Sequence, residues 1–324
     1  MTDNQDSSDE IHSISQRLQT ITTLDNNSVT PRLSNTNIST AVLRSPAGVN
    51  NLSFKDMKKR NYDAKRASES EDNEPVRNLP ELNVPEKIIL IIDITKENNC
   101  TKFKLGTGAT YMPMFMIKRV VEIFVGAKSM IKRTHEFAVM TLCQESIKWI
   151  CDFTSNVKTV LTALDSLIEE PIEEEEDFFD LSQVFETLHA HANLNKNIEA
   201  NEPPAFVTRA ILIYSRSNCI PKFLTGKKYF DLLSENPYFV LDSLFVHEPP
   251  SNDNKCEEVY TELTALDAKS FSYILEVGRN ATKLHDNMAK LLAHPLQRPL
   301  WIIAILSTVI FHCMFFFLSV NIIH

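Results

Sequence analysis

The chain has 324 residues and a formal net charge of -9 at pH 7, with 43% hydrophobic and 23% charged residues. This mild negative charge excludes a dedicated nucleic-acid binder, because such a protein presents a strongly basic surface. Six glycines are too few to favour a protein with glycine-rich phosphate-binding loops. Six cysteines without a C-x-x-C pair predict reduced thiols rather than a disulfide or zinc framework.

Residues 1–84 are rich in Ser, Thr, Asn and Asp, and their only aromatic residues are Phe54 and Tyr62. Such a segment buries too little apolar area to offset the entropy of ordering, so we predict a disordered N-terminal arm. Its acidic start is not a signal peptide. The basic patch at 58–66 is either ordinary solvated charge or a site for nuclear import or an acidic partner.

Ordered structure is expected from Pro85 onwards. Residues 87–93, KIILIID, form a continuous apolar run that is typical of a strand buried on both faces. Further apolar runs predict strands at 136–142, 147–153, 208–214, 238–246 and 271–277, the first two of them as a hairpin. Helical periodicity predicts helices at 116–128, 157–168, 181–192, 227–233, 258–266 and 281–293.

Strands therefore alternate with helices over residues 85–293. This alternation predicts an α/β domain with a doubly wound, mostly parallel central sheet and helices on both faces. In such a fold, ligands bind at the carboxyl ends of the strands.

The first predicted strand ends in DITKE, which places Asp93, Thr95 and Glu97 in the loop at that edge. This loop resembles the metal-ion-dependent adhesion site of von Willebrand factor A domains, an Asp-x-Ser/Thr-x-Ser loop whose oxygens suit Mg²⁺. Here Glu97 replaces the second hydroxyl, and Phe178 and Ser215 stand near the family's other two ligand positions. We predict a degenerate loop with no metal and no cofactor. A Mg²⁺-dependent receptor is the weaker alternative.

The sequence shows no constellation of catalytic residues, so we predict a binding or scaffold protein and not an enzyme. The GTGAT stretch at 106–110 lacks the remaining residues of a nucleotide loop. His189 and His191 would point about 200° apart on a helix, which makes them poor co-ligands of a metal. The acidic run at 169–177 is expected to be a solvated loop, with a basic-partner site as the alternative.

The segments PEKIILIIDITKE, THEFAVMTL, TRAILIYSRSNC, NPYFVLDSLFVH and LHDNMAKLLAHPLQRP follow one another between Pro85 and Pro299. Together they resemble the BRISC and BRCA1-A complex member 1 family (mediator of Rap interactions and targeting). These are von Willebrand-A-like scaffold subunits of the BRISC deubiquitinase and of the related nuclear BRCA1-A complex. The degenerate metal loop belongs to the same family pattern.

The resemblance implies a non-catalytic subunit that stabilises and targets a lysine-63-specific deubiquitinase. The implied partners are the brain-and-reproductive-organ-expressed subunit with its ubiquitin-E2-variant (UEV) domains, an Abraxas-type scaffold and a zinc-dependent JAMM/MPN⁺ peptidase. Ubiquitin would be contacted only indirectly, and nucleic acid not directly. The implied compartments are the cytoplasm and the nucleus, where the complex acts in the DNA double-strand-break response.

The most distinctive part of the resemblance is the stretch HPLQRP, which implies a partner-binding motif made of His294, Pro295, Leu296, Gln297, Arg298 and Pro299. The two prolines favour an extended backbone that suits a partner's groove. Arg298 offers a planar donor fork for a carboxylate or for backbone carbonyls, and Leu296 could fill a small pocket. The alternative is that the prolines only end the last helix.

Residues 300–323 form an apolar run of 24 residues without Asp, Glu, Lys or Arg. As a helix, this run would be about 36 Å long, enough for a bilayer core of about 30 Å. Because its apolar residues lie all around the helix, it predicts a membrane anchor rather than a surface helix. The competing function is therefore a tail-anchored adaptor on an organelle membrane, facing the cytosol. Docking into a partner's groove and a variant C-terminus remain open as alternatives.

Overall fold

The computed structural model describes residues 83–298, except for 99, 145, 175, 195–203 and 270. The predicted arm therefore lies outside the described residues apart from its last two positions, and Pro299 and the apolar run at 300–323 lie outside them altogether. The described residues belong to one compact unit of the chain, Arg77–His324. No helix within this described part is long and apolar enough to cross a membrane.

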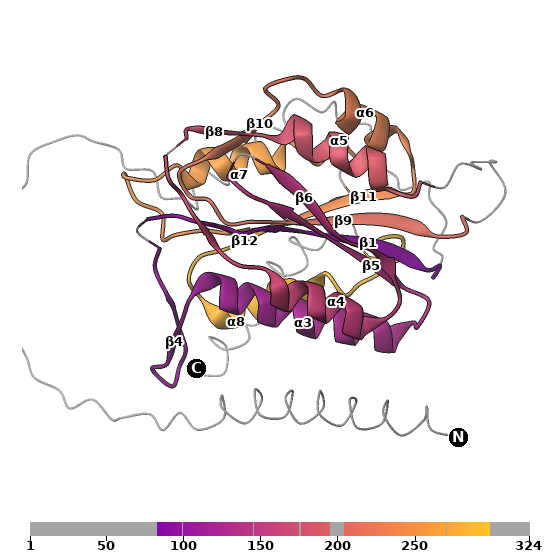
Figure 1. Ribbon diagram of the computed structural model, residues 1–324, viewed down its shortest axis with the longest axis horizontal. Helices are drawn as coiled ribbons and strands as arrows, with labels where there is room; N and C mark the ends of the chain where they lie inside the picture. The colour runs from indigo at the N-terminus through magenta and orange to yellow at the C-terminus, as the bar shows by residue number, and fades with distance from the viewer. Residues whose placement is uncertain are drawn as a thin grey trace, which may run out of the picture. The chain divides into compact units, whose positions relative to one another are not determined.

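A six-stranded sheet forms the centre of the domain (Figure 1). In spatial order its strands are β12 (Ile274–Val277), β11 (Phe239–Val246), β9 (Val207–Tyr214), β1 (Glu86–Asp93), β5 (Glu136–Leu142) and β6 (Ile147–Thr154). Neighbouring strands are parallel, except for β5 and β6, which form an antiparallel hairpin. The predicted strands, the mostly parallel sheet and the hairpin are confirmed.

Helices cover both faces of this sheet (Figure 1). On one face lie α3 (Pro113–Ile131), α4 (Val157–Ser166) and α8 (Ala281–Lys290), and on the other lie α5 (Leu181–His191), α6 (Lys228–Glu235) and α7 (Cys256–Thr264). Ile88, Leu90 and Ile92 of β1 pack towards the first set, and Ile89 and Ile91 towards the second. Because successive side chains point to opposite faces, a continuous apolar strand serves two cores. The doubly wound architecture is confirmed.

The helix α3 extends beyond the predicted 116–128 at both ends. It begins at Pro113, where the fixed φ and the missing N–H suit the first turn of a helix. It ends at Ile131, and the next residue, Lys132, is extended. The apolar period is weakest in these terminal turns, so the boundaries could not be read from it.

Three small two-stranded sheets in the described loops were not predicted. They pair β2 (Thr95–Lys96) with β7 (Glu170–Pro171), β3 (Phe103–Lys104) with β4 (Thr110–Tyr111), and β8 (Phe178–Asp180) with β10 (Ile220–Lys222). Strands of two or three residues show no period that a sequence pattern can reveal. The GTGAT stretch closes the turn between β3 and β4, where Gly108 adopts a φ of 85° that favours glycine.

Candidate functional site

The loop after β1 lies at the carboxyl edge of the parallel sheet, where β1 and β9 are neighbours. Asp93 is fully buried there, and its carboxylate accepts hydrogen bonds from Thr95 N at 3.2 Å and from Ser215 N at 3.1 Å. The structure thus brings together Asp93, Thr95 and Ser215, as the sequence pattern indicated. Parallel neighbouring strands end side by side, so the loops that follow them meet.

Arg216 was not predicted as part of this site, although it follows β9 directly after Ser215. Its Nε donates to both carboxylate oxygens of Asp93, at 3.2 and 3.1 Å, and its Nη2 donates to the carbonyl of Cys143 at 2.7 Å. The guanidinium lies over the ring of Phe179, 4.2 Å from its centre. Burial lowers the pKa of Arg216, but the Asp93 carboxylate raises it further, so the side chain stays charged.

Glu97 is also buried and binds backbone rather than a neighbouring cation. Its Oε1 accepts hydrogen bonds from Ser217 N and Asn218 N, both at 2.8 Å. Burial raises the pKa of Glu97 above its usual value, and the two N–H groups act in the opposite direction. This carboxylate therefore fixes the loop after β9 to the loop after β1.

These residues do not fit the divalent cation that the adhesion loop would imply. A metal ion at Asp93 would meet the Arg216 guanidinium, which already satisfies the carboxylate as its cation. Phe178, near the position of the family's threonine ligand, brings no oxygen ligand. Among the described residues, no group of three or more His, Cys, Asp or Glu side chains could hold a metal ion.

The two histidines of α5 have separate neighbours. His191 stacks on Trp149 with ring centres 4.5 Å apart, while His189 lies 5.2 Å from Tyr229. Their rings are engaged with different aromatic residues, in line with the expectation that they are poor co-ligands.

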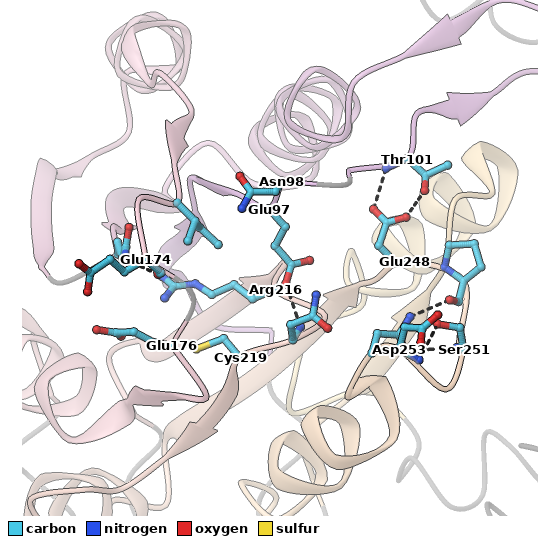
Figure 2. A pocket seen from close by; sticks show the side chains of 15 residues that line it. Glu97, Asn98, Thr101, Glu174, Glu176, Arg216, Cys219, Glu248, Ser251 and Asp253 are labelled. Atoms are coloured by element: carbon cyan, nitrogen blue, oxygen red, sulfur yellow. Dashed lines mark hydrogen bonds between the residues drawn. The ribbon is translucent and has the colours of Figure 1, made fainter.

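A pocket of about 330 Å³ opens beside the adhesion loop (Figure 2). Its carboxylates are Glu97, Glu174, Glu176, Glu248 and Asp253. Two of them come from the acidic run at 169–177, so part of this run faces the pocket and not only bulk solvent. Glu248 is already engaged, because it accepts hydrogen bonds from Thr101 N at 2.9 Å and from Arg279 Nε at 3.1 Å.

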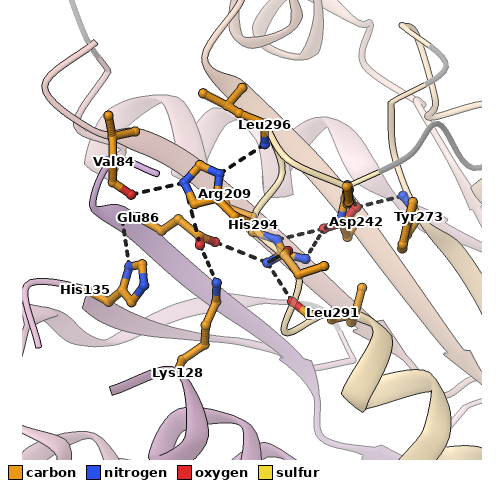
Figure 3. A network of polar contacts seen from close by, with 12 residues as sticks. Val84, Glu86, Lys128, His135, Arg209, Asp242, Tyr273, Leu291, His294 and Leu296 are labelled. Atoms are coloured by element: carbon orange, nitrogen blue, oxygen red, sulfur yellow. Dashed lines mark hydrogen bonds and ion pairs between the residues drawn. The ribbon is translucent and has the colours of Figure 1, made fainter. Parts of the chain in front are cut away.

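Residues 294–298 of the HPLQRP motif lie at the opposite, amino edge of the sheet, beside Val84 and the start of β9 (Figure 3). Their backbone forms a turn, in which Gln297 N and Arg298 N donate to the carbonyl of His294 at 2.9 and 3.0 Å. His294 Nε2 lies 3.0 Å from the carbonyl of Val84, and its Nδ1 accepts from Leu296 N at 3.1 Å. The prediction of an extended backbone is therefore wrong for residues 294–298. The carbonyl and the Nδ1 of His294 instead accept the backbone N–H groups of a turn.

Four residues of this motif are buried in the domain: His294, Pro295, Leu296 and Arg298. Leu296 is fully buried and packs with Val207, Tyr238 and Val240. The pocket that was expected on a partner for this leucine is thus supplied by the chain itself. Of the five described residues, only Gln297 is exposed. A partner-binding role of the motif stays a prediction.

Arg298 anchors the end of the motif on β11. Its Nη1 donates to Asp242 Oδ2 at 2.9 Å, its Nη2 bonds Asp242 Oδ1, and Nη2 also donates to the carbonyl of Phe271 at 2.9 Å. The guanidinium lies 4.0 Å from the ring centre of Tyr273. This is the planar fork expected of Arg298, but the carboxylate belongs to the same chain.

Asp242 joins Arg298 to a buried ionic network that sequence reasoning missed (Figure 3). Arg209 donates through Nε to Asp242 Oδ2 at 2.7 Å and pairs through Nη1 with Glu86 Oε2 at 3.2 Å. Glu86 also pairs with Lys128 of α3. The pKa values of both carboxylates are lowered, because these cations outweigh burial, which raises them. The signal in the sequence that could have revealed this network was a charged residue in each of three otherwise apolar strands.

The fold and this edge loop define a class of protein: a von Willebrand A-like domain, here with Arg216 paired to the aspartate of the loop after β1. Two solved von Willebrand A structures are similar to the chain at low identity. The SpRpn10 VWA domain is 12% identical with a TM-score of 0.40, covering 67% of this chain and 99% of that one. A von Willebrand factor type A structure from Catenulispora acidiphila is 12% identical with a TM-score of 0.42, covering 66% and 43%.

No family model matches the chain. BRISC and BRCA1-A complex member 1 of mouse is 34% identical over 230 residues, which cover 68% of this chain and 66% of the mouse protein. The human protein of that name is 32% identical over 230 residues, with 68% and 67% covered. This chain belongs to the BRISC and BRCA1-A complex member 1 family. It spans about two thirds of the length of these relatives.

Proposed function

We propose that this chain is a non-catalytic scaffold subunit that stabilises and targets a lysine-63-specific deubiquitinase, of the BRISC or BRCA1-A type. The observation that carries this proposal is the 34% identity to a protein named as a member of those complexes. The replacement of metal chemistry by the Arg216–Asp93 ion pair supports a structural role for the edge loop.

The proposed partners are a UEV-domain subunit, an Abraxas-type scaffold and a JAMM/MPN⁺ zinc peptidase, with ubiquitin contacted only through them. The proposed compartments are the cytoplasm and the nucleus, with a role in the DNA double-strand-break response. Residues 294–299 are proposed as the segment that binds the UEV-domain subunit. Gln297, the exposed residue among positions 294–298, supports this assignment, because a partner can reach its side chain.

The test is reconstitution of the full chain with the three partner subunits, followed by size-exclusion chromatography and a titration with the UEV-domain subunit alone. We expect one complex, with lysine-63 chain cleavage only when the peptidase is present. Gln297→Arg should weaken UEV binding about tenfold, or ~1.4 kcal/mol. The matched control Thr282→Arg places the same side chain on an exposed position of α8 and should bind normally. A chain that elutes alone contradicts the proposal.

A second candidate function rests on the uncharged run at 300–323. In this alternative, the chain is a tail-anchored adaptor that recruits its partners to an organelle membrane. The measurement is carbonate extraction of membranes from cells that express the full chain or a variant lacking residues 300–324. Carbonate-resistant association that is lost in the variant is the expected result, and equal extraction of both chains contradicts it.

A further inference from the structure

The segment proposed to bind a partner is already engaged by its own domain. Residues 294–298, here called the strap, are held at three points. His294 Nε2 lies 3.0 Å from the carbonyl of Val84. Leu296 fills an apolar pocket lined by Val207, Tyr238 and Val240, and Arg298 is held by Asp242 on β11. A partner that takes up these side chains has to compete with all three contacts.

The contacts of the buried network make Arg298 its most dispensable cation. Lys128, Arg209 and Arg298 face only two carboxylates, Glu86 and Asp242, so the loss of any one cation leaves the charges balanced. When Arg298 leaves, each carboxylate still has a cation, and the pairs of Arg209 with both carboxylates remain. Removal of Arg209 would instead take a contact from both carboxylates.

Asp242 also keeps a hydrogen-bond donor on each oxygen when Arg298 leaves. Its Oδ2 stays bonded to Arg209 Nε at 2.7 Å, and its Oδ1 accepts from Tyr273 N at 2.7 Å. A buried carboxylate whose oxygens both remain bonded does not need a second cation. The domain therefore tolerates an open strap, and the loss comprises the leucine pocket, the contacts of the Arg298 fork and the contact of His294 with the carbonyl of Val84.

We propose that the strap is displaceable and that the UEV-domain subunit binds it only after it has left the domain. This inference rests on the proposed function of residues 294–299. Leu296 then leaves the pocket of its own domain for a pocket of the partner. Arg298 likewise exchanges the acceptors of its own domain for acceptors of the partner. Since only the open fraction of the chain is competent to bind, the apparent affinity is weaker than that of the free segment by that fraction.

The experiment compares three ligands for the recombinant UEV-domain subunit: a synthetic peptide of residues 290–299, the full chain, and the full chain with Tyr238→Ala. The substitution removes one wall of the leucine pocket without touching the strap. Tyr238→Phe is the matched control, because it keeps the wall. Hydrogen exchange of Gln297 and Arg298, whose amides donate to the His294 carbonyl, reports opening directly.

We expect the peptide to bind several-fold more tightly than the chain, Tyr238→Ala to move the chain towards the peptide's affinity, and its strap amides to exchange faster. Tyr238→Phe should match the unsubstituted chain. A peptide that binds no more tightly than the chain contradicts the displacement of the strap, but leaves the proposed role of residues 294–299 standing. A peptide that does not bind the UEV-domain subunit contradicts the proposed role of residues 294–299, and therefore also the displacement of the strap. The comparison of peptide with unsubstituted chain decides the matter even if Tyr238→Ala fails to fold.

Discussion

Arg216 replaces, with one side chain, the cation that an adhesion loop otherwise holds. It pairs with Asp93, bonds the carbonyl of Cys143 and lies against Phe179, so its charge, its donors and its flat face are all engaged. A guanidinium suits this position because its planar fork can serve several acceptors at once. At the carboxyl edge, the Asp93 carboxylate is thereby engaged in a buried ion pair.

We expect Arg216→Ala to lower the free energy of unfolding by roughly 3–5 kcal/mol, because it leaves the Asp93 carboxylate buried without a cation. The double variant Arg216→Met with Asp93→Asn should recover much of this loss, since no charge is then buried. Urea denaturation of the three proteins measures both effects. A double variant that is no more stable than Arg216→Ala would contradict the ion-pair explanation.

His135 makes folding sensitive to moderate acidity. Its Nδ1 accepts the hydrogen bond of Glu86 N at 2.9 Å, and burial lowers its pKa from 6.5 to about 4, against the opposing charge of Glu86. Between these two values the unfolded chain binds a proton that the folded chain does not. Stability from this group is therefore lost as the pH falls below about 6.5, by about 1.4 kcal/mol per pH unit.

We expect the free energy of unfolding to fall by roughly 2 kcal/mol from this histidine alone between pH 7 and pH 5. His135→Gln should retain an acceptor for Glu86 N and show a shallower pH dependence. Some slope should remain, because burial also lowers the pKa values of His247 and His294. The measurement is denaturant unfolding at half-unit pH steps, and an unchanged slope in His135→Gln would rule the explanation out.

At the scale of elements, the N-cap residues of α4 and α5 differ in the number of chain segments that they contact. Asn156 caps α4 alone, accepting from Lys158 N at 3.0 Å and Thr159 N at 3.3 Å. Asp180 caps α5 through Ser182 N at 2.9 Å and also accepts from Leu224 N at 3.0 Å, in the loop after β10. One carboxylate thus joins a helix start to a second segment.

We expect Asn156→Ala to cost about 1 kcal/mol and Asp180→Ala about twice that, because the second change also releases the loop after β10. Asn156→Ser and Asp180→Ser, which keep a capping oxygen, are the matched controls. Thermal unfolding monitored by circular dichroism gives the comparison. Equal losses at the two caps would show that the contact with Leu224 contributes nothing.

The long elements could be predicted because each repeats a period that burial enforces. The run at 87–93 alternates between two cores, and the short connection between 142 and 147 required a hairpin. The pairs β2–β7 and β8–β10 had no such signal, because their partners are far apart in sequence. They form where the loops of the carboxyl edge meet, which only the assembled sheet decides.

At the scale of the whole molecule, Arg209 is the centre of the buried network. It contacts Glu86 on β1, Asp242 on β11 and the carbonyl of Leu291 beyond α8, the last at 2.8 Å. Its charge therefore connects three strands and the segment that leads into the strap. Arg298 contacts only one of the two carboxylates.

We expect Arg209→Met to lower the free energy of unfolding by roughly 3–5 kcal/mol, because both buried carboxylates lose a cation. Arg298→Met should cost less, roughly 1.5–3 kcal/mol, since of the two carboxylates only Asp242 loses a contact and both of its oxygens stay bonded. The two methionine variants are matched in volume and differ in the network they leave behind. Chemical denaturation compares them, and equal losses would contradict the central position of Arg209.

The sequence by itself determined the α/β class, the order and nearly all the positions of the long elements, and the family. The period of apolar residues and a set of ordered segments carry that information along the chain. The sequence also placed Asp93, Thr95 and Glu97 in one loop. The tertiary structure alone decided that Arg216 would pair with Asp93, and that Leu296 and Arg298 would fold back onto their own domain. Those partners are separated by tens of residues or more, and the contacts exist only because the strands of the finished sheet bring distant positions side by side.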